Sequence, residues 1–69
     1  MKGKKIDWYA EPLDWIEDMS RELRTALDDG FEVAPRRLLA RIEIVEAHLG
    51  RKTKLGNASR RLMQKAGFI

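Results

Sequence analysis

Few side chains in this chain of 69 residues have the types and spacing that catalysis requires. The sequence contains no Cys, so it offers neither a thiol nucleophile nor a thiolate metal ligand. His48 is the single imidazole, and no Ser or Asp stands at the helical spacing that would complete a triad with it. The adjacent acids Glu17 and Asp18 project in different directions from a helix, so they do not share a proton. We therefore expect a protein that is not an enzyme and uses no cofactor or metal.

The basic residues near the C-terminus have the chemistry to bind nucleic acid. A short helix there would present four polar side chains to phosphates and base edges: Arg60, Arg61, Gln64 and Lys65. DNA would repel the acidic residues 6–34, and the Lys-rich connection before this helix exceeds the tight turn of a helix-turn-helix. A small helix-turn-helix-like DNA-binding regulator is therefore the alternative function. A solubilising basic tail would explain the same charges.

A third group has the residue types that dominate protein–protein interfaces, namely aromatic, Met and Arg side chains. Ile44 is an apolar residue inside a basic strip that consists of Arg37, Arg41 and His48. Ile44 would either anchor a partner or pack under an N-terminal flap formed by residues 1–11. The basic strip and Ile44 together are one predicted partner-binding surface. The other is the acidic face of the first helix: Asp14, Glu17 and Asp18.

Three helical segments must position these side chains. Pro12 suits a first helical turn and Gly30 a left-handed C-terminal position, which predicts the first helix over residues 12–29. Four of its apolar residues fall on one stripe: Leu13, Ile16, Leu23 and Leu27. Three more widen it: Trp15, Met19 and Ala26. Such a face exceeds what one neighbouring helix covers, although Trp15 also fits a simple core position.

The second helix is predicted over residues 35–49, because Pro35 again suits a first helical turn. Its buried stripe is expected to hold Leu38, Ile42, Val45 and Leu49. Phe31 and Val33 precede this helix and are expected to plug the end of the hairpin.

A third, short and basic helix is predicted over residues 58–66, after a loop over residues 51–57 that ends at Asn57 as the N-cap. Its apolar side would hold Leu55, Ala58, Leu62, Ala66 and Ile69. The expected architecture is an all-α helical hairpin with a short third helix, in a single domain.

Length and charge favour association with other chains. A domain of 69 residues buries about 60% of its unfolded surface, so without disulfides or a metal its own core would be marginal. We therefore expect a homodimer, with Trp15, Met19, Leu23 and Ala26 at the dimer interface. The net charge of +3 hides a contrast, because residues 6–34 carry −7 and residues 51–69 carry +6. This contrast favours head-to-tail self-association or two partner surfaces, although a solvated surface would show it too.

Nothing in the sequence indicates a membrane or secreted protein. No apolar run approaches the roughly 20 residues of a membrane span, and no signal-peptide core follows the Met-Lys-Gly-Lys-Lys start. We expect a soluble protein of a reducing compartment, the cytoplasm.

Two segments carry a resemblance to a known family. The runs Trp8-Tyr9-Ala10-Glu11-Pro12-Leu13-Asp14-Trp15-Ile16 and Ala34-Pro35-Arg36-Arg37-Leu38-Leu39-Ala40-Arg41 resemble the small phage-encoded quorum-sensing anti-activator proteins, with similarity over the whole chain. The resemblance implies a helical homodimer that binds a LuxR-type transcription activator in the host cytoplasm and prevents its DNA binding. It also implies inhibition of the type IV pilus assembly ATPase, which would exclude superinfection by pilus-dependent phages. No binding residue carries over, because the resemblance supplies no motif.

The two predicted surfaces give a hypothesis for the mechanism. The DNA-binding domain of an activator is basic, so the acidic face of the first helix would compete with DNA for that domain. The basic strip around Ile44 is the rival contact, and it suits an acidic or mixed patch with an apolar hole. Two chemically distinct surfaces would also allow two unrelated partners.

Overall fold

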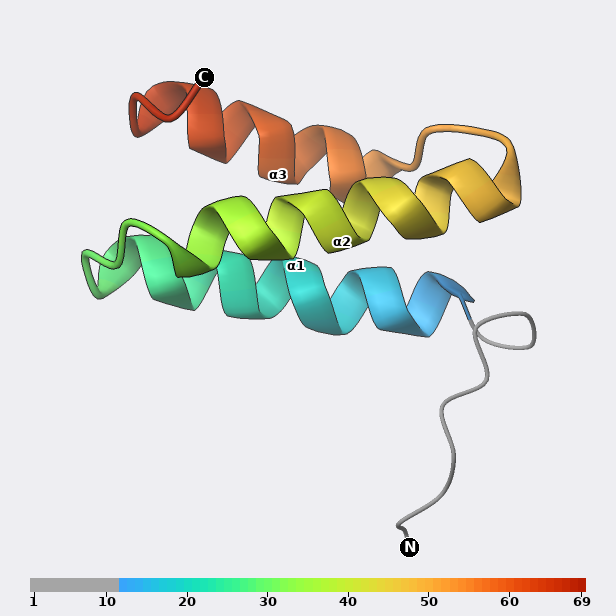
Figure 1. The fold of residues 1–69 in the computed structure, drawn as a ribbon, viewed down its shortest axis with the longest axis horizontal. Helices are drawn as coiled ribbons and strands as arrows, with labels where there is room; N and C mark the ends of the chain where they lie inside the picture. The colour runs from blue at the N-terminus through green and yellow to red at the C-terminus, as the bar shows by residue number, and fades with distance from the viewer. Residues whose placement is uncertain (1–11) are drawn as a thin grey trace, which may run out of the picture.

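The computed structural model describes residues 12–69, which form three α-helices and no strand. The helices are α1 (Pro12–Asp28), α2 (Ala34–Leu49) and α3 (Lys54–Lys65). They lie side by side, and each runs in the opposite direction to the one before it (Figure 1). The prediction of an all-α fold with three helices is confirmed. The expected N-terminal flap, residues 1–11, lies outside the described residues.

α1 forms within one residue of the predicted range. Its buried residues recur every three or four positions and give it one apolar face: Ile16, Met19, Leu23 and Ala26. The chain leaves α1 through Gly30, whose φ of 82° favours glycine, and the Phe31 N–H donates to the Ala26 carbonyl at 3.0 Å. Leu13, which was expected on the buried stripe, is about half exposed, and it lines a cleft at the start of α1 together with the exposed Leu55.

The apolar face of α1 is covered within the single chain. Because α1 contacts both α2 and α3, the side chains of Met19, Leu23 and Ala26 are buried in the core. The prediction that a second chain covers these three residues is therefore corrected, since it allowed for only one neighbouring helix. Trp15, the fourth residue of that predicted interface, is half-buried and packs against the edge of the core.

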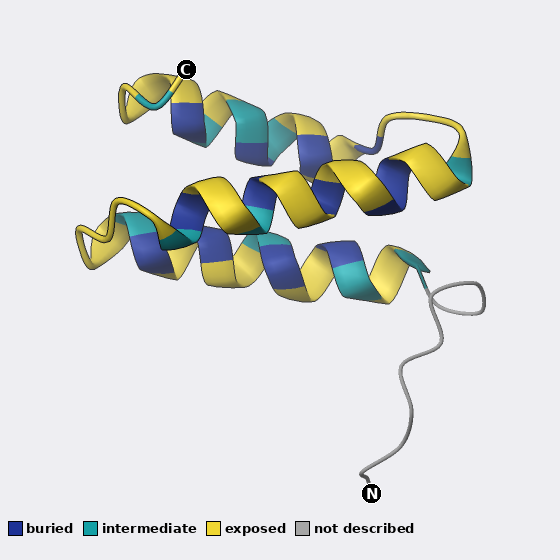
Figure 2. Cartoon of the chain, in the orientation of Figure 1, coloured by how far each residue is buried: buried dark blue, intermediate teal, exposed yellow. Residues whose placement is uncertain are grey.

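The core lies between the three helices, as the buried turns in Figure 2 show. α2 contributes Pro35, Leu39, Ile42, Val45 and Glu46. Leu38 and Leu49, which were expected in the buried stripe, are only half-buried. The buried face of α2 includes Leu39 and Glu46 because α3 packs against that side of the helix.

α3 begins four residues earlier than predicted, and Thr53 is its N-cap in place of Asn57. The Thr53 backbone is extended, and its Oγ1 accepts a hydrogen bond from the Gly56 N–H at 2.9 Å. Gly56 has the propensity of a helix breaker, but a Cβ at this position would lie 2.8 Å from the Glu46 Cδ and 2.9 Å from the Thr53 Oγ1. Glycine therefore lets α3 approach the end of α2 closely.

The buried face of α3 differs in part from the predicted one, because of the predicted side only Leu62 packs against the core, and it is half-buried. Gly56, Ser59 and Met63 face the core, whereas Leu55 and Ile69 are exposed. The small residues at positions 56 and 59 permit the close approach of the helices. The Ser59 hydroxyl is satisfied there, because it lies 3.0 Å from the Ser20 hydroxyl of α1.

Phe31 and Val33 do not plug the hairpin end. Both are more than half exposed. Phe31 instead lines a surface cleft.

Candidate protein-binding site

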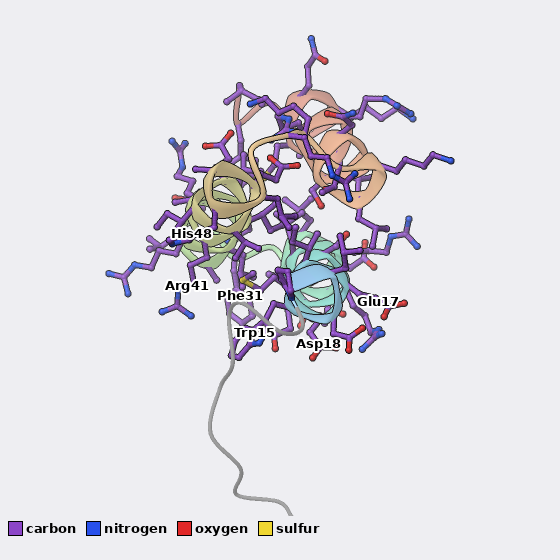
Figure 3. All side chains as sticks on the ribbon, turned by 90° about the vertical axis from the view of Figure 1, so that its right-hand side faces the viewer. Trp15, Glu17, Asp18, Phe31, Arg41 and His48 are labelled. Atoms are coloured by element: carbon purple, nitrogen blue, oxygen red, sulfur yellow. The ribbon has the colours of Figure 1, made fainter. Side chains whose placement is uncertain are left out.

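A groove follows the seam between α1 and α2. Its main cleft has a volume of about 550 Å³ and is lined by Trp15, Asp18, Met19, Glu22, Leu38, Arg41 and Ile44. Figure 3 shows Trp15 and Arg41 on the side of the α1–α2 pair that faces away from α3. The two helices therefore form both walls, and α3 leaves this face uncovered.

Apolar side chains form the floor and one rim of the groove. Met19 is buried and Leu38 half-buried, so both contribute to the floor. Ile44 is 56% exposed although it is a large aliphatic residue, and it stands at the rim on α2. Such a side chain loses unfavourable contact with water when a partner covers it.

The two walls carry opposite charges. Asp18 and Glu22 line the groove from α1, and Arg41 lines it from α2. Asp18 pairs along its own helix with Arg21 at 3.2 Å, and both side chains are two-thirds exposed, so solvent weakens this pair. Within residues 12–69 no ion pair crosses the groove from Asp18 or Glu22 to Arg41. The opposed charges remain available to the charges of a partner.

A second cleft of about 320 Å³ continues the groove towards the α1–α2 turn. Its lining includes Ala26, Asp29, Phe31 and Ala34. Glu22 and Leu38 line both clefts, so the two form one continuous groove.

The predicted acidic face of α1 is divided between two clefts. Asp18 lines the α1–α2 groove, whereas Asp14 and Glu17 line a different cleft of about 320 Å³ with Arg51 and Lys54. Figure 3 shows Glu17 on the side of α1 away from Trp15 and Arg41. The three acids therefore do not form one surface.

The predicted basic strip lies on the exposed side of α2, as expected. Arg37, Arg41, Ile44 and His48 are all exposed. Arg41 and Ile44 line the groove, while Arg37 and His48 are not among its lining residues. The structure thus brings part of each predicted surface, Asp18 from one and Arg41 with Ile44 from the other, to the same groove.

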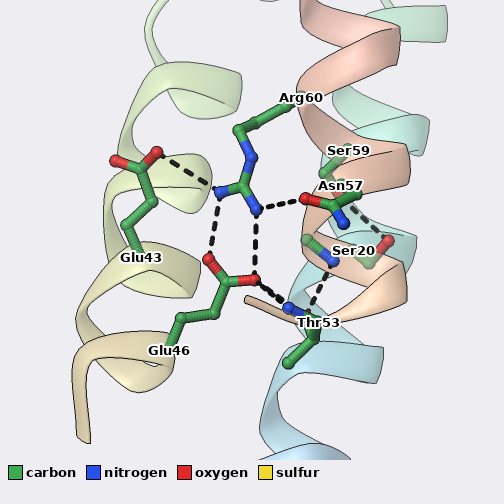
Figure 4. Close-up of polar contacts among 8 residues, drawn as sticks. Ser20, Glu43, Glu46, Thr53, Asn57, Ser59 and Arg60 are labelled. Atoms are coloured by element: carbon green, nitrogen blue, oxygen red, sulfur yellow. Dashed lines mark hydrogen bonds and ion pairs between the residues drawn. The ribbon is translucent and has the colours of Figure 1, made fainter. Parts of the chain in front are cut away.

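A buried ionic cluster on the far side of α2 was not predicted (Figure 4). The Glu46 carboxylate is 3% exposed, and it accepts hydrogen bonds from the Thr53 N–H at 2.7 Å and the Thr53 hydroxyl at 2.9 Å. Arg60 donates to the same carboxylate at 3.0 and 3.2 Å. Burial alone would raise the pKa of Glu46, but the hydrogen bonds from Arg60 and Thr53 outweigh it and lower that pKa below its ordinary value.

This cluster engages one of the residues proposed for DNA contact. Arg60 also donates to Asn57 Oδ1 at 2.8 Å and pairs with Glu43 at 3.4 Å, and its bond to Glu46 raises its pKa. Arg61, Gln64 and Lys65 stay exposed on α3. α2 and α3 run antiparallel (Figure 1), whereas the helices of a helix-turn-helix cross steeply.

No helix within residues 12–69 is long and apolar enough to cross a membrane. No group of three or more His, Asp or Glu side chains in the same range could hold a metal ion. Comparisons of the chain with protein-family models, with curated proteins and with solved structures give no match, so the α1–α2 groove is the basis for assigning a function.

Proposed function

We propose that this chain is a non-enzymatic phage inhibitor that binds a host LuxR-type quorum-sensing transcription activator and blocks its DNA binding. The observation that carries the proposal is the α1–α2 groove, in which the exposed Ile44 stands beside Arg41 on the α2 wall, with Asp18 and Glu22 on the α1 wall. A few anchor residues, Arg among them, carry most of the binding energy of a protein interface, and the contacts around them exclude water. The identity of the partner comes from the resemblance to the anti-activator proteins.

The acidic wall supplies a mechanism for the inhibition. An activator binds DNA through a basic surface, and carboxylates that approach this surface compete with the DNA phosphates. Asp18 and Glu22 lie in the groove, so they would meet that surface while Ile44 anchors the complex. Asp14 and Glu17 face another cleft and therefore are not part of the proposed contact.

The proposal includes a homodimer and a second partner, the type IV pilus assembly ATPase, all in the host cytoplasm. A second apolar surface outside the groove supports more than one contact. Leu13 and Leu55 are exposed and line the cleft between the N-terminal ends of α1 and α3. Light scattering is expected to give twice the mass of one chain. A single-chain mass would contradict the homodimer without affecting the groove.

A gel-shift titration with the purified activator and its promoter DNA tests the main proposal. We expect the wild-type chain to release the DNA. The variant Arg41→Ala/Ile44→Ala is expected to need at least ten times more protein for the same release, a difference of about 1.4 kcal/mol. The matched control is Arg61→Ala/Ile69→Ala, which removes the same residue types from exposed positions outside the groove. The control should equal the wild type.

Two other variants test whether the acidic residues of the groove, and not those of the other cleft, are needed for the release of DNA. Asp18→Lys/Glu22→Lys should abolish the release of DNA, while Asp14→Lys/Glu17→Lys should leave it intact. Failure of the wild type to release the DNA, or equal activity of the groove variant, would contradict the proposal. If the chain itself retards DNA in a salt-sensitive way that Arg61→Ala/Lys65→Ala abolishes, the chain is the alternative DNA-binding regulator.

A further inference from the structure

We infer that the segment bound in the α1–α2 groove is an amphipathic helix of about four turns with mixed-charge flanks. Its apolar stripe would face Met19 and Leu38. Basic residues would flank the stripe on the side of α1, and acidic residues on the side of α2. The inference rests on the proposed function and names the chemistry of the partner segment that this function requires.

The length of the groove sets the length of the bound segment. The two clefts share Glu22 and Leu38, and their lining along α1 and the first residue after it runs from Trp15 to Asp29. These fourteen steps at 1.5 Å per residue span about 21 Å. A helix of about four turns has this length.

The backbone of the groove selects a helix over an extended peptide. An extended peptide that relies on main-chain hydrogen bonds obtains them by adding a strand to a sheet edge, and residues 12–69 contain no strand. The walls are α1 and α2, whose backbone groups are already paired within each helix. The N–H and C=O groups that an extended occupant turned towards these walls would therefore find no backbone partner there. A helix pairs these groups internally and needs only an apolar stripe.

The charges on the walls select the flanks of that helix. Asp18 and Glu22 stand on the α1 side of the main cleft. Asp29 lines the second cleft together with Arg21, which pairs with Asp18, so the acidic wall is continuous only along the main cleft. Arg41 stands on the α2 side, and no ion pair in the described residues joins it to the acidic wall. In a helix with two acidic flanks, one flank would lie against Asp18 and Glu22 and be repelled by them. In a helix with two basic flanks, one flank would lie against Arg41 and be repelled by it.

The exposed apolar residues provide an anchor at each end of the groove. Ile44 lies at the end near Trp15, and Phe31 lines the cleft at the end near the turn. Both are more than half exposed, so a bound helix would remove apolar surface from water at both ends.

Three synthetic helical peptides with one common apolar stripe test the inference by calorimetric titration against the full chain. The first has Lys on one flank and Glu on the other, the second has Glu on both, and the third has Lys on both. We expect the mixed peptide to bind at least ten times more tightly than either uniform peptide. A wild-type chain that binds all three equally, or none, would overturn the inference.

Variants of the chain test whether the peptide binds in the groove. Ile44→Ala and Glu22→Lys should each weaken binding of the mixed peptide at least ten-fold. Ile69→Ala and Glu17→Lys are the matched controls, and both should bind like the wild type. Glu17 lies on the same helix as Glu22 but on the other side of it (Figure 3). If the controls weaken binding as much as the groove variants, the peptide binds elsewhere and the inference is wrong.

The peptide experiment and the DNA-release experiment can fail independently of each other. If the chain releases the activator from DNA through Ile44 but binds no helical peptide, the function stands and the inference fails. If the mixed peptide binds but the activator is unaffected, the inference stands and the function fails. A second copy is the other possible occupant. A dimer that Ile44→Ala converts to monomer in sedimentation, with no peptide binding, would overturn the inference in favour of that second copy.

Discussion

The carboxylate of Glu46 on α2 and the guanidinium of Arg60 on α3 meet in a two-point contact. Arg60 Nη1 lies 3.0 Å from Oε1 of Glu46, and Nη2 lies 3.2 Å from Oε2 (Figure 4). Thr53 completes the shell of the same carboxylate with its N–H and its hydroxyl. No buried side-chain nitrogen or oxygen in the described residues lacks a hydrogen-bond partner. The α2–α3 corner is therefore held by a fully satisfied ionic cluster.

Removal of Glu46 should destabilise the fold far more than removal of its neighbour. Glu46→Ala leaves the Thr53 N–H and part of the Arg60 guanidinium without a partner, so we expect a loss of about 3 kcal/mol in the free energy of unfolding. Glu43→Ala removes only a longer contact from a half-exposed side chain, and it should cost less than about 1 kcal/mol. Urea unfolding of both variants measures the difference. Equal losses would mean that Glu46 contributes no more than a surface ion pair.

The low pKa of Glu46 predicts loss of stability in acid. Because the carboxyl takes up a proton less readily in the folded chain than in the unfolded chain, its stabilisation is complete above its ordinary pKa of 4.5. The stabilisation is lost as the pH falls through the lower pKa of the folded state. Glu46→Gln should therefore flatten the dependence of the unfolding free energy on pH below 4.5. Glu43→Gln is the control, and it should keep the wild-type slope.

The two candidate N-caps of α3 can be told apart by substitution. Thr53→Ala removes the hydroxyl that accepts from the Gly56 N–H and donates to Glu46, so it should cost at least about 1 kcal/mol. Thr53→Ser keeps that hydroxyl and should restore most of the stability. Asn57→Ala removes only an exposed bond from Arg60 and should cost less than about 0.5 kcal/mol. Thermal unfolding of the three variants tests this order, and a larger loss at Asn57 would contradict it.

Truncation of two isoleucines that lie about half a turn apart on α2 should lower the free energy of unfolding by very different amounts. Ile42 is 0% exposed, so Ile42→Ala should cost about 3 kcal/mol in unfolding free energy. Ile44 stands at the rim of the groove, so Ile44→Ala should change stability by less than about 0.5 kcal/mol. Circular dichroism with urea measures both. A large loss for Ile44→Ala would mean that this side chain is part of the core and is not free to anchor a partner.

Local signals were sufficient for α1 and α2. Pro12 with Gly30, and Pro35 before the apolar period, placed both helices within about one residue. They were insufficient for the start of α3, because Gly56 and Asn57 in sequence are typical of a loop and its cap. The signal that places the start correctly is Thr53, but it is strong only because Glu46, seven residues earlier, bonds to it.

The candidate site was predicted in part. Helical spacing placed Arg41 and Ile44 on the exposed side of α2, and the structure puts them there. Spacing within one helix did not show that Asp18 faces Arg41 across a groove while Glu17 faces away, because this depends on how α1 packs against α2. Burial of Glu46 was missed for the same reason, since a glutamate is normally exposed unless distant residues satisfy it.

The close approach at Gly56 links two positions that lie ten residues apart in the chain. A side chain at position 56 would collide with the carboxylate end of Glu46, so position 56 can gain a Cβ only where position 46 carries a shorter residue. A shorter residue at position 46 would in turn remove the two contacts that Arg60 makes with Glu46. The positions 46, 56 and 60 should therefore change together among sequences that share this fold, and a natural variant with only one of the three altered should be rare.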